Sequence, residues 1–151
     1  AKLMVRNNKG VIIFGSSFGA SCYMHCAAYG AQKAGLDKMA HDMAVDLKPF
    51  NVQAVSIWMG PLLTERALIA AEVHPEQYKE FIATAETPQF IGHICHAILR
   101  DEKADEINGH TVISAEIAKD RYGILDRESK QPPSYREMLG SPNLPNPAIV
   151  Y

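Results

Sequence analysis

The chain has 151 residues, of which 47% are hydrophobic and 21% charged, a balance typical of one globular domain with a real core. Its formal net charge is -2 with both signs interspersed, which argues against nucleic acid or an anionic membrane as a partner. No apolar run is long enough to span a bilayer, and no signal peptide is recognised. The three cysteines fit no Cys-x-x-Cys pattern, so reduced thiols and a cytoplasmic location are expected.

The first predicted elements are a helix end, a strand and a long helix. Residues 2–9 read as the end of a helix running into a polar turn, with Gly10 as the stop. Residues 11–16 are a continuous apolar run, typical of a parallel strand buried on both faces. A helix is predicted over residues 27–48, ended by Pro49. Its apolar residues recur at spacings of three and four, namely Leu36, Met39, Met43 and Leu47.

A second buried strand is predicted over residues 51–58, which completes a strand, helix, strand unit that should form a parallel pair. A third strand is expected over residues 109–114. From residue 122 onward, five prolines break every periodic pattern, so residues 122–151 are expected to be an extended tail on the domain formed by residues 1–121, or on a neighbouring subunit. The helices expected between the second and third strands cover residues 65–72, 75–84 and 88–99.

Tyr29 and Lys33 carry the strongest chemical signal, with Ser17 just upstream at the end of the first strand. Residues four apart share one helical face. An ammonium beside a phenol favours the phenolate, so the tyrosine could give or take a proton. A hydroxyl such as that of Ser17 could hold a carbonyl oxygen against the phenol. The pattern therefore indicates carbonyl reduction or alcohol oxidation.

The order of these motifs resembles the short-chain dehydrogenase/reductase family over at least residues 10–115. In that family a catalytic serine ends one strand, Tyr-x-x-x-Lys opens the next helix, and Pro-Gly-x-x-x-Thr follows the strand after; Met59 stands here where the family usually has the proline. The resemblance implies an α/β fold with a Rossmann-like, doubly wound parallel sheet. It also implies an oxidoreductase that uses NAD or NADP to interconvert a small-molecule carbonyl and an alcohol.

The same resemblance implies roles for individual residues. Tyr29 would be the general acid/base, Lys33 would favour its phenolate and bind the nicotinamide ribose, and Ser17 would orient the substrate carbonyl. Ser16 is the weaker candidate for the serine. The remaining cofactor contacts would come from the turn after the second strand, namely from Gly60, Leu62 and Thr64.

Several parts of the family pattern are not found in this sequence. It has no glycine-rich turn after a first strand and no Asn-Ala-Gly stretch, so it resembles the C-terminal half of the family's domain, with about three strands. Such a sheet would have an open apolar edge, which we expect the N-terminal half, a second polypeptide or self-association to cover. A homo-oligomer is expected by analogy. More weakly, three segments resemble the branch containing dehydrogenase/reductase family member one, namely residues 56–60, 84–88 and 118–123.

Two other functions stay open at this stage. The chain could be a non-catalytic half-domain whose open edge and proline-rich tail serve assembly, and cofactor binding would distinguish the two. Alternatively, residues 15–19 satisfy Gly-x-Ser-x-Gly directly after an apolar run, the pattern of a serine hydrolase with Ser17 as nucleophile. Its acid and base would be Asp101 or Asp105 and then His110, but this reading leaves the tyrosine and lysine unexplained.

Histidines and cysteines also form loose clusters along the chain. His93 and His96 share a helical face, and His25 lies between two cysteines in sequence. Neither cluster has a complete ligand group at metal spacing, so no metal site is expected. His25 could line a substrate pocket instead. Three large side chains are expected to be packing residues, namely Met39, Met43 and Trp58.

Overall fold

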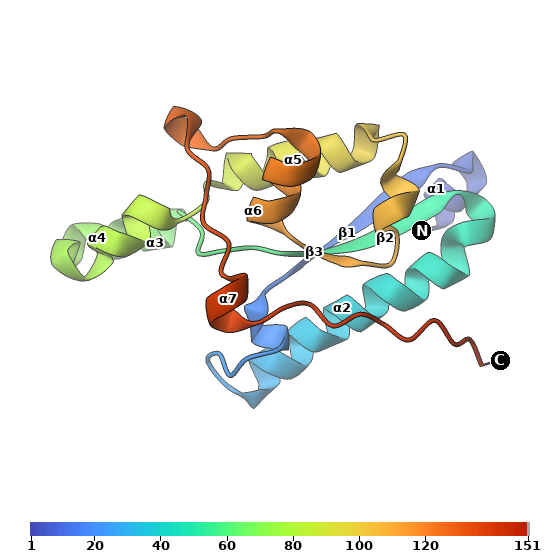
Figure 1. Ribbon diagram of the computed structural model, residues 1–151, viewed down its shortest axis with the longest axis horizontal. Coiled ribbons are helices and arrows are strands. Elements are labelled where there is room, and N and C mark those ends of the chain that lie inside the picture. The colour runs from blue at the N-terminus through green and yellow to red at the C-terminus, as the bar shows by residue number, and fades with distance from the viewer. Residues whose placement is uncertain (151) are drawn as a thin grey trace.

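The computed structural model describes residues 1–150 and shows one parallel sheet between two layers of helices (Figure 1). The sheet has the strand order β1 (Gly10–Ser16), β2 (Val52–Trp58) and β3 (Thr111–Ile113). All the pairings are parallel, and the first two strands align along their whole length. The predicted α/β fold with three parallel strands is confirmed.

The third strand is shorter than predicted. β3 pairs only with residues 56–58 of β2, and the chain on both sides of it adopts other conformations. Gly109 has a φ of 77°, which ends extended structure before the strand, and its N–H donates to Ala54 O at 2.8 Å. After the strand, Ser114 immediately begins the short helix α6 (Ser114–Ile117).

Helix α2 (Ala27–Leu47) covers one face of the sheet (Figure 1). Its buried residues are Ala40, Ala44 and Leu47, which let the helix approach β2 closely. The prediction that Met39 packs in the core is wrong, because its side chain is 49% exposed. Leu47 is buried and Met43 is half-buried on the predicted apolar face, so the error concerns Met39, which lies beside the buried Ala40.

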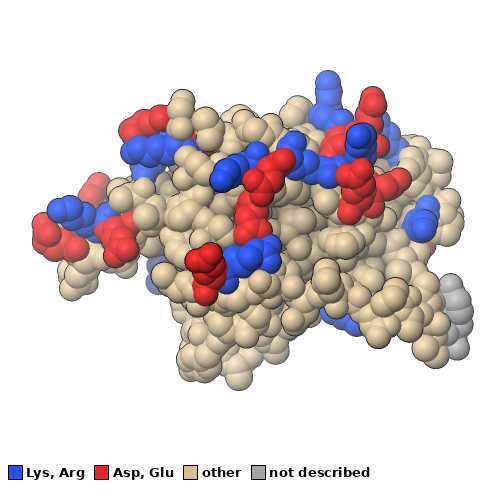
Figure 2. All heavy atoms as spheres, viewed as in Figure 1, with Lys and Arg blue, Asp and Glu red and all other residues tan. Residues whose placement is uncertain are grey.

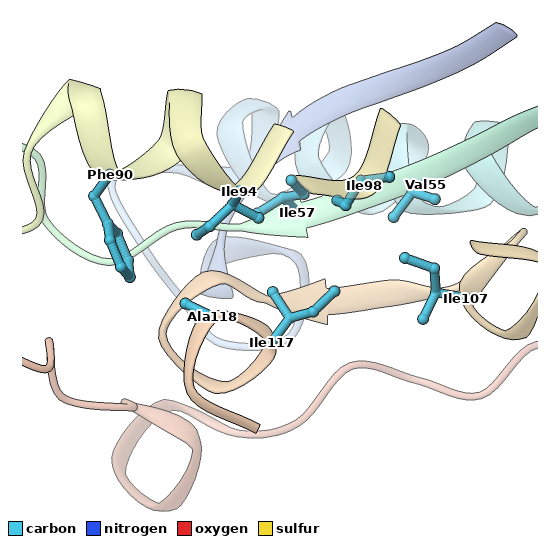
Figure 3. Close-up of a cluster of buried hydrophobic side chains, with 8 residues drawn as sticks. All are labelled: Val55, Ile57, Phe90, Ile94, Ile98, Ile107, Ile117 and Ala118. Atoms are coloured by element: carbon cyan, nitrogen blue, oxygen red, sulfur yellow. The ribbon is translucent and has the colours of Figure 1, made fainter. Parts of the chain in front are cut away.

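The main hydrophobic core lies between β2 and the helices on the other face of the sheet (Figure 3). Helix α5 (Pro88–Arg100) has its apolar residues at helical spacing, so one side of it is buried. Thr87 caps its N-terminus by accepting from Phe90 N at 3.1 Å, and Pro88 occupies the first turn. The core residues are Val55, Ile57, Phe90, Ile94, Ile98, Ile107, Ile117 and Ala118.

The start of the chain differs from its prediction in one detail. Helix α1 (Lys2–Asn7) ends at Asn8, which adopts the left-handed conformation with a φ of 49°. Gly10 is therefore not the helix stop but the first residue of β1. A Cβ on Gly10 would lie 2.6 Å from Met4 Cγ, so the glycine allows α1 to pack against the strand.

Helices α3 (Glu65–Val73) and α4 (Pro75–Thr84) confirm the two predicted short helices and project from the end of the sheet (Figure 1). Neither contains a buried residue. Short helical turns complete the fold. They are η1 (Phe18–Ala20), η2 (Lys48–Phe50), η3 (Ala104–Ile107), η4 (Ala118–Tyr122), η5 (Arg127–Ser129) and α7 (Arg136–Leu139).

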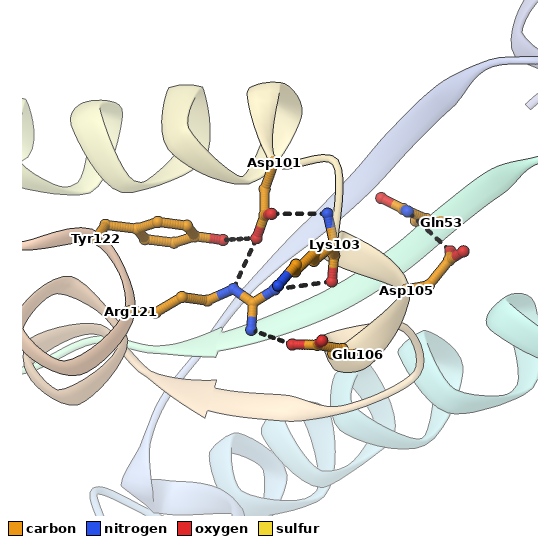
Figure 4. Close-up of polar contacts among 7 residues, drawn as sticks. All are labelled: Gln53, Asp101, Lys103, Asp105, Glu106, Arg121 and Tyr122. Carbon is orange, nitrogen blue, oxygen red and sulfur yellow. Dashed lines mark hydrogen bonds and ion pairs between the residues drawn. The ribbon is translucent and has the colours of Figure 1, made fainter.

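A cluster of polar side chains lies where the C-terminal end of α5 meets η3 and η4 (Figure 4). Asp101 accepts from Arg121 Nε at 2.6 Å and from Tyr122 OH at 3.0 Å, and Arg121 also donates to Glu106 at 2.8 Å. The Arg121 guanidinium holds the pKa of the Asp101 carboxyl below its usual range. Burial, followed by the bond to Asp101, raises the pKa of Tyr122 to about 12. The cluster ties the end of α5 to η3 and η4.

The proline-rich segment after η4 returns across the molecule and runs along α2 (Figure 1). Tyr135 packs edge-on against Phe18, with ring centroids 6.2 Å apart. Ser21 Oγ donates to Leu139 O at 3.3 Å, which attaches α7 to the loop after β1. On the face shown in Figure 2, positive and negative side chains are interspersed. Among the described residues, no helix combines the length and apolar character that crossing a membrane requires.

Candidate active site

The predicted site residues lie at the carboxyl end of the sheet, where parallel strands bring their following loops together. Ser17 directly follows β1, and the turn of residues 59–64 directly follows β2. Met59 N–H points to Ser16 O at 3.4 Å, so the two loops adjoin. The serine and the predicted cofactor-side turn, separated by more than forty positions in sequence, therefore share one edge of the sheet.

Ser17 and Tyr29 face each other across this edge. Ser17 Oγ lies 2.9 Å from Tyr29 OH, a distance at which either hydroxyl can donate. Tyr29 sits on the first turn of α2, and Ser17 caps η1 by accepting from Gly19 N at 3.3 Å. The cap fixes the serine, and the helix fixes the tyrosine.

Lys33 joins this pair from the next turn of α2. Its Nζ lies 5.4 Å from the centroid of the Tyr29 ring and donates to Gly15 O at 3.0 Å. The carbonyl at the end of β1 thus holds the ammonium beside the phenol. The structure brings together the three residues that the sequence predicts to be catalytic, Ser17, Tyr29 and Lys33.

The two neighbouring serines have different environments. Ser16 is fully buried and donates to Lys33 O at 3.1 Å, so its hydroxyl links β1 to the backbone of α2. Ser17 is half-buried and meets the phenol. Of the two, only Ser17 has its hydroxyl bonded to Tyr29 among the described residues.

His25 also contacts Tyr29. Its imidazole packs edge-on against the phenol ring, with centroids 4.8 Å apart and an interplanar angle of 87°. The backbone of His25 has a φ of 60°, an unusual value for a residue other than glycine. Cys22 and Cys26 on either side are free thiols. In the part of the chain that the structure describes, no three histidine, cysteine or acidic side chains are grouped for a metal.

The predicted cofactor-side residues form an ordered turn. Leu62 forms a parallel bridge with Glu86, and Leu63 is buried beneath the turn. Thr64 is exposed and caps α3, accepting from Ala67 N at 3.3 Å. Gly60 is half-buried, because other side chains cover it. The structure therefore places Gly60, Leu62 and Thr64 on the same edge of the sheet as Tyr29. The Thr64 hydroxyl is already engaged as the N-terminal cap of α3.

Sequence reasoning missed two residues of this edge, Glu86 and Tyr135. Glu86 is 2% exposed and accepts from Ser114 Oγ at 2.5 Å, while burial raises its pKa to about 7. Tyr135 belongs to the proline-rich tail, and a Cβ on Gly60 would lie 3.3 Å from its ring. A single glutamate in a polar segment gives no sequence signal of burial. A tyrosine in a tail gives no signal of where the tail lies.

The geometry gives the hydrolase alternative no support. A serine nucleophile needs a base within hydrogen-bond reach, whereas the side chain recorded against Ser17 Oγ is the Tyr29 phenol. Asp101 is held by Arg121 and Tyr122 in the cluster of Figure 4. The glycine at the end of the 15–19 motif has a different use, because it allows η1 to approach the Tyr29 ring.

Known proteins resemble this chain in sequence and in fold. The family model described as short chain dehydrogenase matches residues 1–73, the N-terminal part of this chain, which contains Ser17, Tyr29 and Lys33. The match does not extend over the second half of the chain. A similar protein is mouse dehydrogenase/reductase SDR family member 1, 32% identical over 142 residues. Its human counterpart is 31% identical over the same length.

These two relatives align with 89% of this chain but only 45% of their own length, so the chain spans less than half of each. Among solved structures, an oxidoreductase of the short chain dehydrogenase/reductase family from Burkholderia thailandensis matches 74% of the chain with a TM-score of 0.62 at 20% identity, over 45% of its own length. A 7α-hydroxysteroid dehydrogenase complexed with NADH and 7-oxo glycochenodeoxycholic acid matches 85% with a TM-score of 0.59 at 22% identity, over 47% of its length.

These structural matches show the fold, a partial Rossmann-like α/β domain. The sequence matches to the family model and to the mouse and human proteins show the relationship. Residues 1–73 match the short chain dehydrogenase family, and the chain resembles the mouse and human proteins over less than half of their length.

Proposed function

We propose that this chain carries the catalytic residues of an NAD(P)-dependent oxidoreductase that interconverts a carbonyl and an alcohol. The observation that supports it most is the distance of 2.9 Å between Ser17 Oγ and Tyr29 OH, with the Lys33 ammonium beside the phenol ring. A substrate oxygen that accepts from both hydroxyls would lie between a hydrogen-bond donor and a proton donor. The match of residues 1–73 to the short chain dehydrogenase family supports an oxidoreductase over other reactions that the same three side chains could perform.

In the direction of reduction, Ser17 Oγ donates a hydrogen bond to the carbonyl oxygen and Tyr29 OH transfers its proton to that oxygen as negative charge develops there. The phenolate that forms is stabilised by the charge of Lys33, which Gly15 O keeps in place. In oxidation, the phenolate takes the proton of the alcohol. A nicotinamide, when bound, supplies or accepts the hydride.

The residues at this edge fit a nicotinamide ribose and the groups next to it. Lys33 brings a cation and Tyr29 a hydroxyl to the same side of α2, and the turn at Gly60 and Leu62 faces the same edge. A cradle for the diphosphate on a glycine-rich turn is not part of this sequence. Relatives by fold are described with NADH or NAD, and another with NADP. We therefore propose NAD or NADP without choosing between them.

We further propose that these residues correspond to the C-terminal half of a complete family domain. Three observations support this: the catalytic motif is present, the glycine-rich motif is not, and the chain spans less than half of its relatives. The outer edge of β1 has no partner strand among the described residues, and its apolar residues 11–14 are only half-buried. The N-terminal half or a second copy of the chain would pair there.

The test begins with the intact mass of the natural protein, because the cofactor half requires a species heavier than 16.6 kDa. That protein is then assayed with NADH and NADPH against small aldehydes and ketones. Tyr29→Phe should abolish turnover while cofactor binding persists. Tyr23→Phe is the matched control, since Tyr23 is 87% exposed and should leave turnover unchanged. Full turnover by the Tyr29→Phe variant would contradict the proposal.

A further inference from the structure

We propose that Glu86 is the positioning residue for the turn of residues 60–64, which it holds through both its backbone and its carboxyl, and that the carboxyl works as a neutral acid. This inference rests on the proposed function for its consequence, because that turn would face the nicotinamide. The contacts of Glu86 themselves do not depend on any ligand.

The backbone of Glu86 is paired with the turn on both sides of Leu62. Glu86 N–H donates to Pro61 O at 2.8 Å, and Glu86 O accepts from Leu63 N–H at 2.9 Å. Together they form the parallel bridge between Leu62 and Glu86. The segment before α5 thus acts as a one-residue strand that fixes the path of the turn.

The side chain of Glu86 fixes the same turn from inside. Its Oε1 accepts from Ser114 Oγ at 2.5 Å, which connects it to the first residue of α6. A Cβ on Gly60 would lie 3.2 Å from this oxygen and 3.3 Å from the ring of Tyr135. Gly60 therefore fills a slot between the carboxyl and the tyrosine, and a larger residue would displace one of them.

The second carboxyl oxygen of Glu86 has no hydrogen-bond partner among the described residues, although the side chain is buried. A buried carboxylate with an unpartnered oxygen and no paired cation is more unfavourable than the neutral acid, which carries no charge. Burial raises the pKa of Glu86 to about 7, and the Asp126 carboxylate adds to the rise. The Ser114 hydroxyl and the Gly60 backbone N–H act in the opposite direction.

The charged and titratable groups around Glu86 come from different elements. Asp126, in the segment after η4, is held in place because Thr87 N and Thr87 Oγ1 donate to it at 2.8 and 2.5 Å. Tyr135, from the tail, contacts the same glycine. As pH rises through about 7, Glu86 acquires a charge that must be hydrated, and the turn must loosen to admit water.

The consequence is a pH-dependent affinity for the nicotinamide end of the cofactor. The turn is held in one conformation while Glu86 is protonated, and it is released as Glu86 ionises. Glu86→Gln keeps the shape and hydrogen-bonding capacity of the neutral acid but cannot ionise, so it should keep the turn closed at all working pH values. The effect of Glu86 on cofactor binding would thus be transmitted through residues 60–64.

The test follows the backbone amides of Gly60, Leu62 and Leu63 by NMR in the isotopically labelled natural protein, from about pH 5 to about pH 9. The three amides should shift together with one midpoint near 7, and Glu86→Gln should abolish this shift. Two further variants should move the midpoint in opposite directions. Asp126→Asn removes a repelling charge and should lower it, whereas Ser114→Ala removes a stabilising donor and should raise it.

Amides that do not titrate in this range, or that titrate equally in Glu86→Gln, would overturn the proposal. A separate titration with NADPH and NADH tests the consequence in the natural protein. Affinity should weaken by about tenfold from about pH 6 to about pH 8 in the wild type and stay constant in Glu86→Gln. If no variant binds either cofactor, the proposed function fails while the NMR result still decides the role of Glu86.

Discussion

Gly19 lies directly against the ring of Tyr29: a Cβ built on Gly19 would come within 2.5 Å of Tyr29 Cε1. No side chain can be accommodated there unless the ring or η1 moves. The phenol keeps its place beside Ser17 because position 19 has no side chain. This contact explains the glycine of the 15–19 motif by packing, without a nucleophile elbow.

Gly19→Ala should therefore displace the Tyr29 ring and lower turnover by about 10²-fold, with a loss of about 1 to 3 kcal/mol in the free energy of unfolding. Gly35→Ala is the matched control, because a Cβ at that helical position meets nothing within 4 Å. The control should stabilise the protein by about 0.5 to 1 kcal/mol and leave turnover intact. Steady-state kinetics and chemical denaturation measure both effects, and unchanged kinetics in Gly19→Ala would contradict the assignment of Tyr29.

The two serines at the end of β1 should separate activity from stability. Ser17→Ala removes the hydroxyl 2.9 Å from Tyr29 OH and should reduce turnover by about 10²-fold or more with little loss of stability. Ser16→Ala removes a buried donor to Lys33 O and should cost about 1 kcal/mol in the free energy of unfolding. If Ser16→Ala instead had the larger effect on turnover at equal stability, the two roles would have to be exchanged.

Asp37 should contribute more to the free energy of unfolding than an ordinary polar residue of a helix. Its two oxygens accept from Ser56 Oγ at 2.6 Å and Trp58 Nε1 at 2.8 Å, which anchors α2 to buried polar groups of β2. Asp37→Asn offers one acceptor instead of two and should cost about 1 to 3 kcal/mol in urea denaturation. Asp42→Asn is the control, since that side chain is 53% exposed and pairs with Lys38, and should change stability by less than about 0.5 kcal/mol. Equal effects of the two variants would refute the anchoring role.

Glu86 should make stability fall as pH rises. Its folded pKa of about 7 lies above the ordinary value of 4.5, so the folded state binds the extra proton between these values. The stabilising contribution is complete below about pH 4.5 and is lost by about pH 7. Glu86→Gln should match the wild type at about pH 4.5 and be more stable by about 2 to 3 kcal/mol at about pH 8. Thermal unfolding of both proteins across this pH range measures the difference in stability. If stability changed with pH in the same way in the two proteins, the pKa of Glu86 would not be raised in the folded state.

Local patterns in the sequence predict most of the fold. The strand at β1, the helix at α2 and the strand at β2 lie within one or two residues of their predicted bounds, because continuous apolar runs and a helical pattern ended by a proline carry strong local signals. On α2, Leu47 is buried as predicted, but Met39 is exposed while Ala40 and Ala44 are buried. Alanines at a close contact between a helix and a sheet contribute little to a hydrophobic pattern, so the sequence does not identify them as buried.

Some residues of the candidate site could be predicted from the sequence and others could not. Ser17, Tyr29 and Lys33 could be predicted because the motif spacing fixes their relation to β1 and α2. Glu86 and Tyr135 could not, because their neighbours come from segments far away in sequence, and only the tertiary fold brings them to Gly60. The path of an irregular segment such as the proline-rich tail cannot be predicted from its sequence, because the segment has no periodic pattern of apolar residues.

The tail also makes the site vulnerable to proteases. Tyr135 covers Phe18 and Gly60, while Leu139 is attached to Ser21, yet the peptide from Gly123 to this point carries several exposed residues. A single cut in that peptide would leave the sheet and its core intact, and the aromatic cover of the site would then depend on side-chain contacts such as the ion pair of Arg136 with Glu116. Preparations identical in secondary structure could then differ in activity, according to how much of each had been clipped.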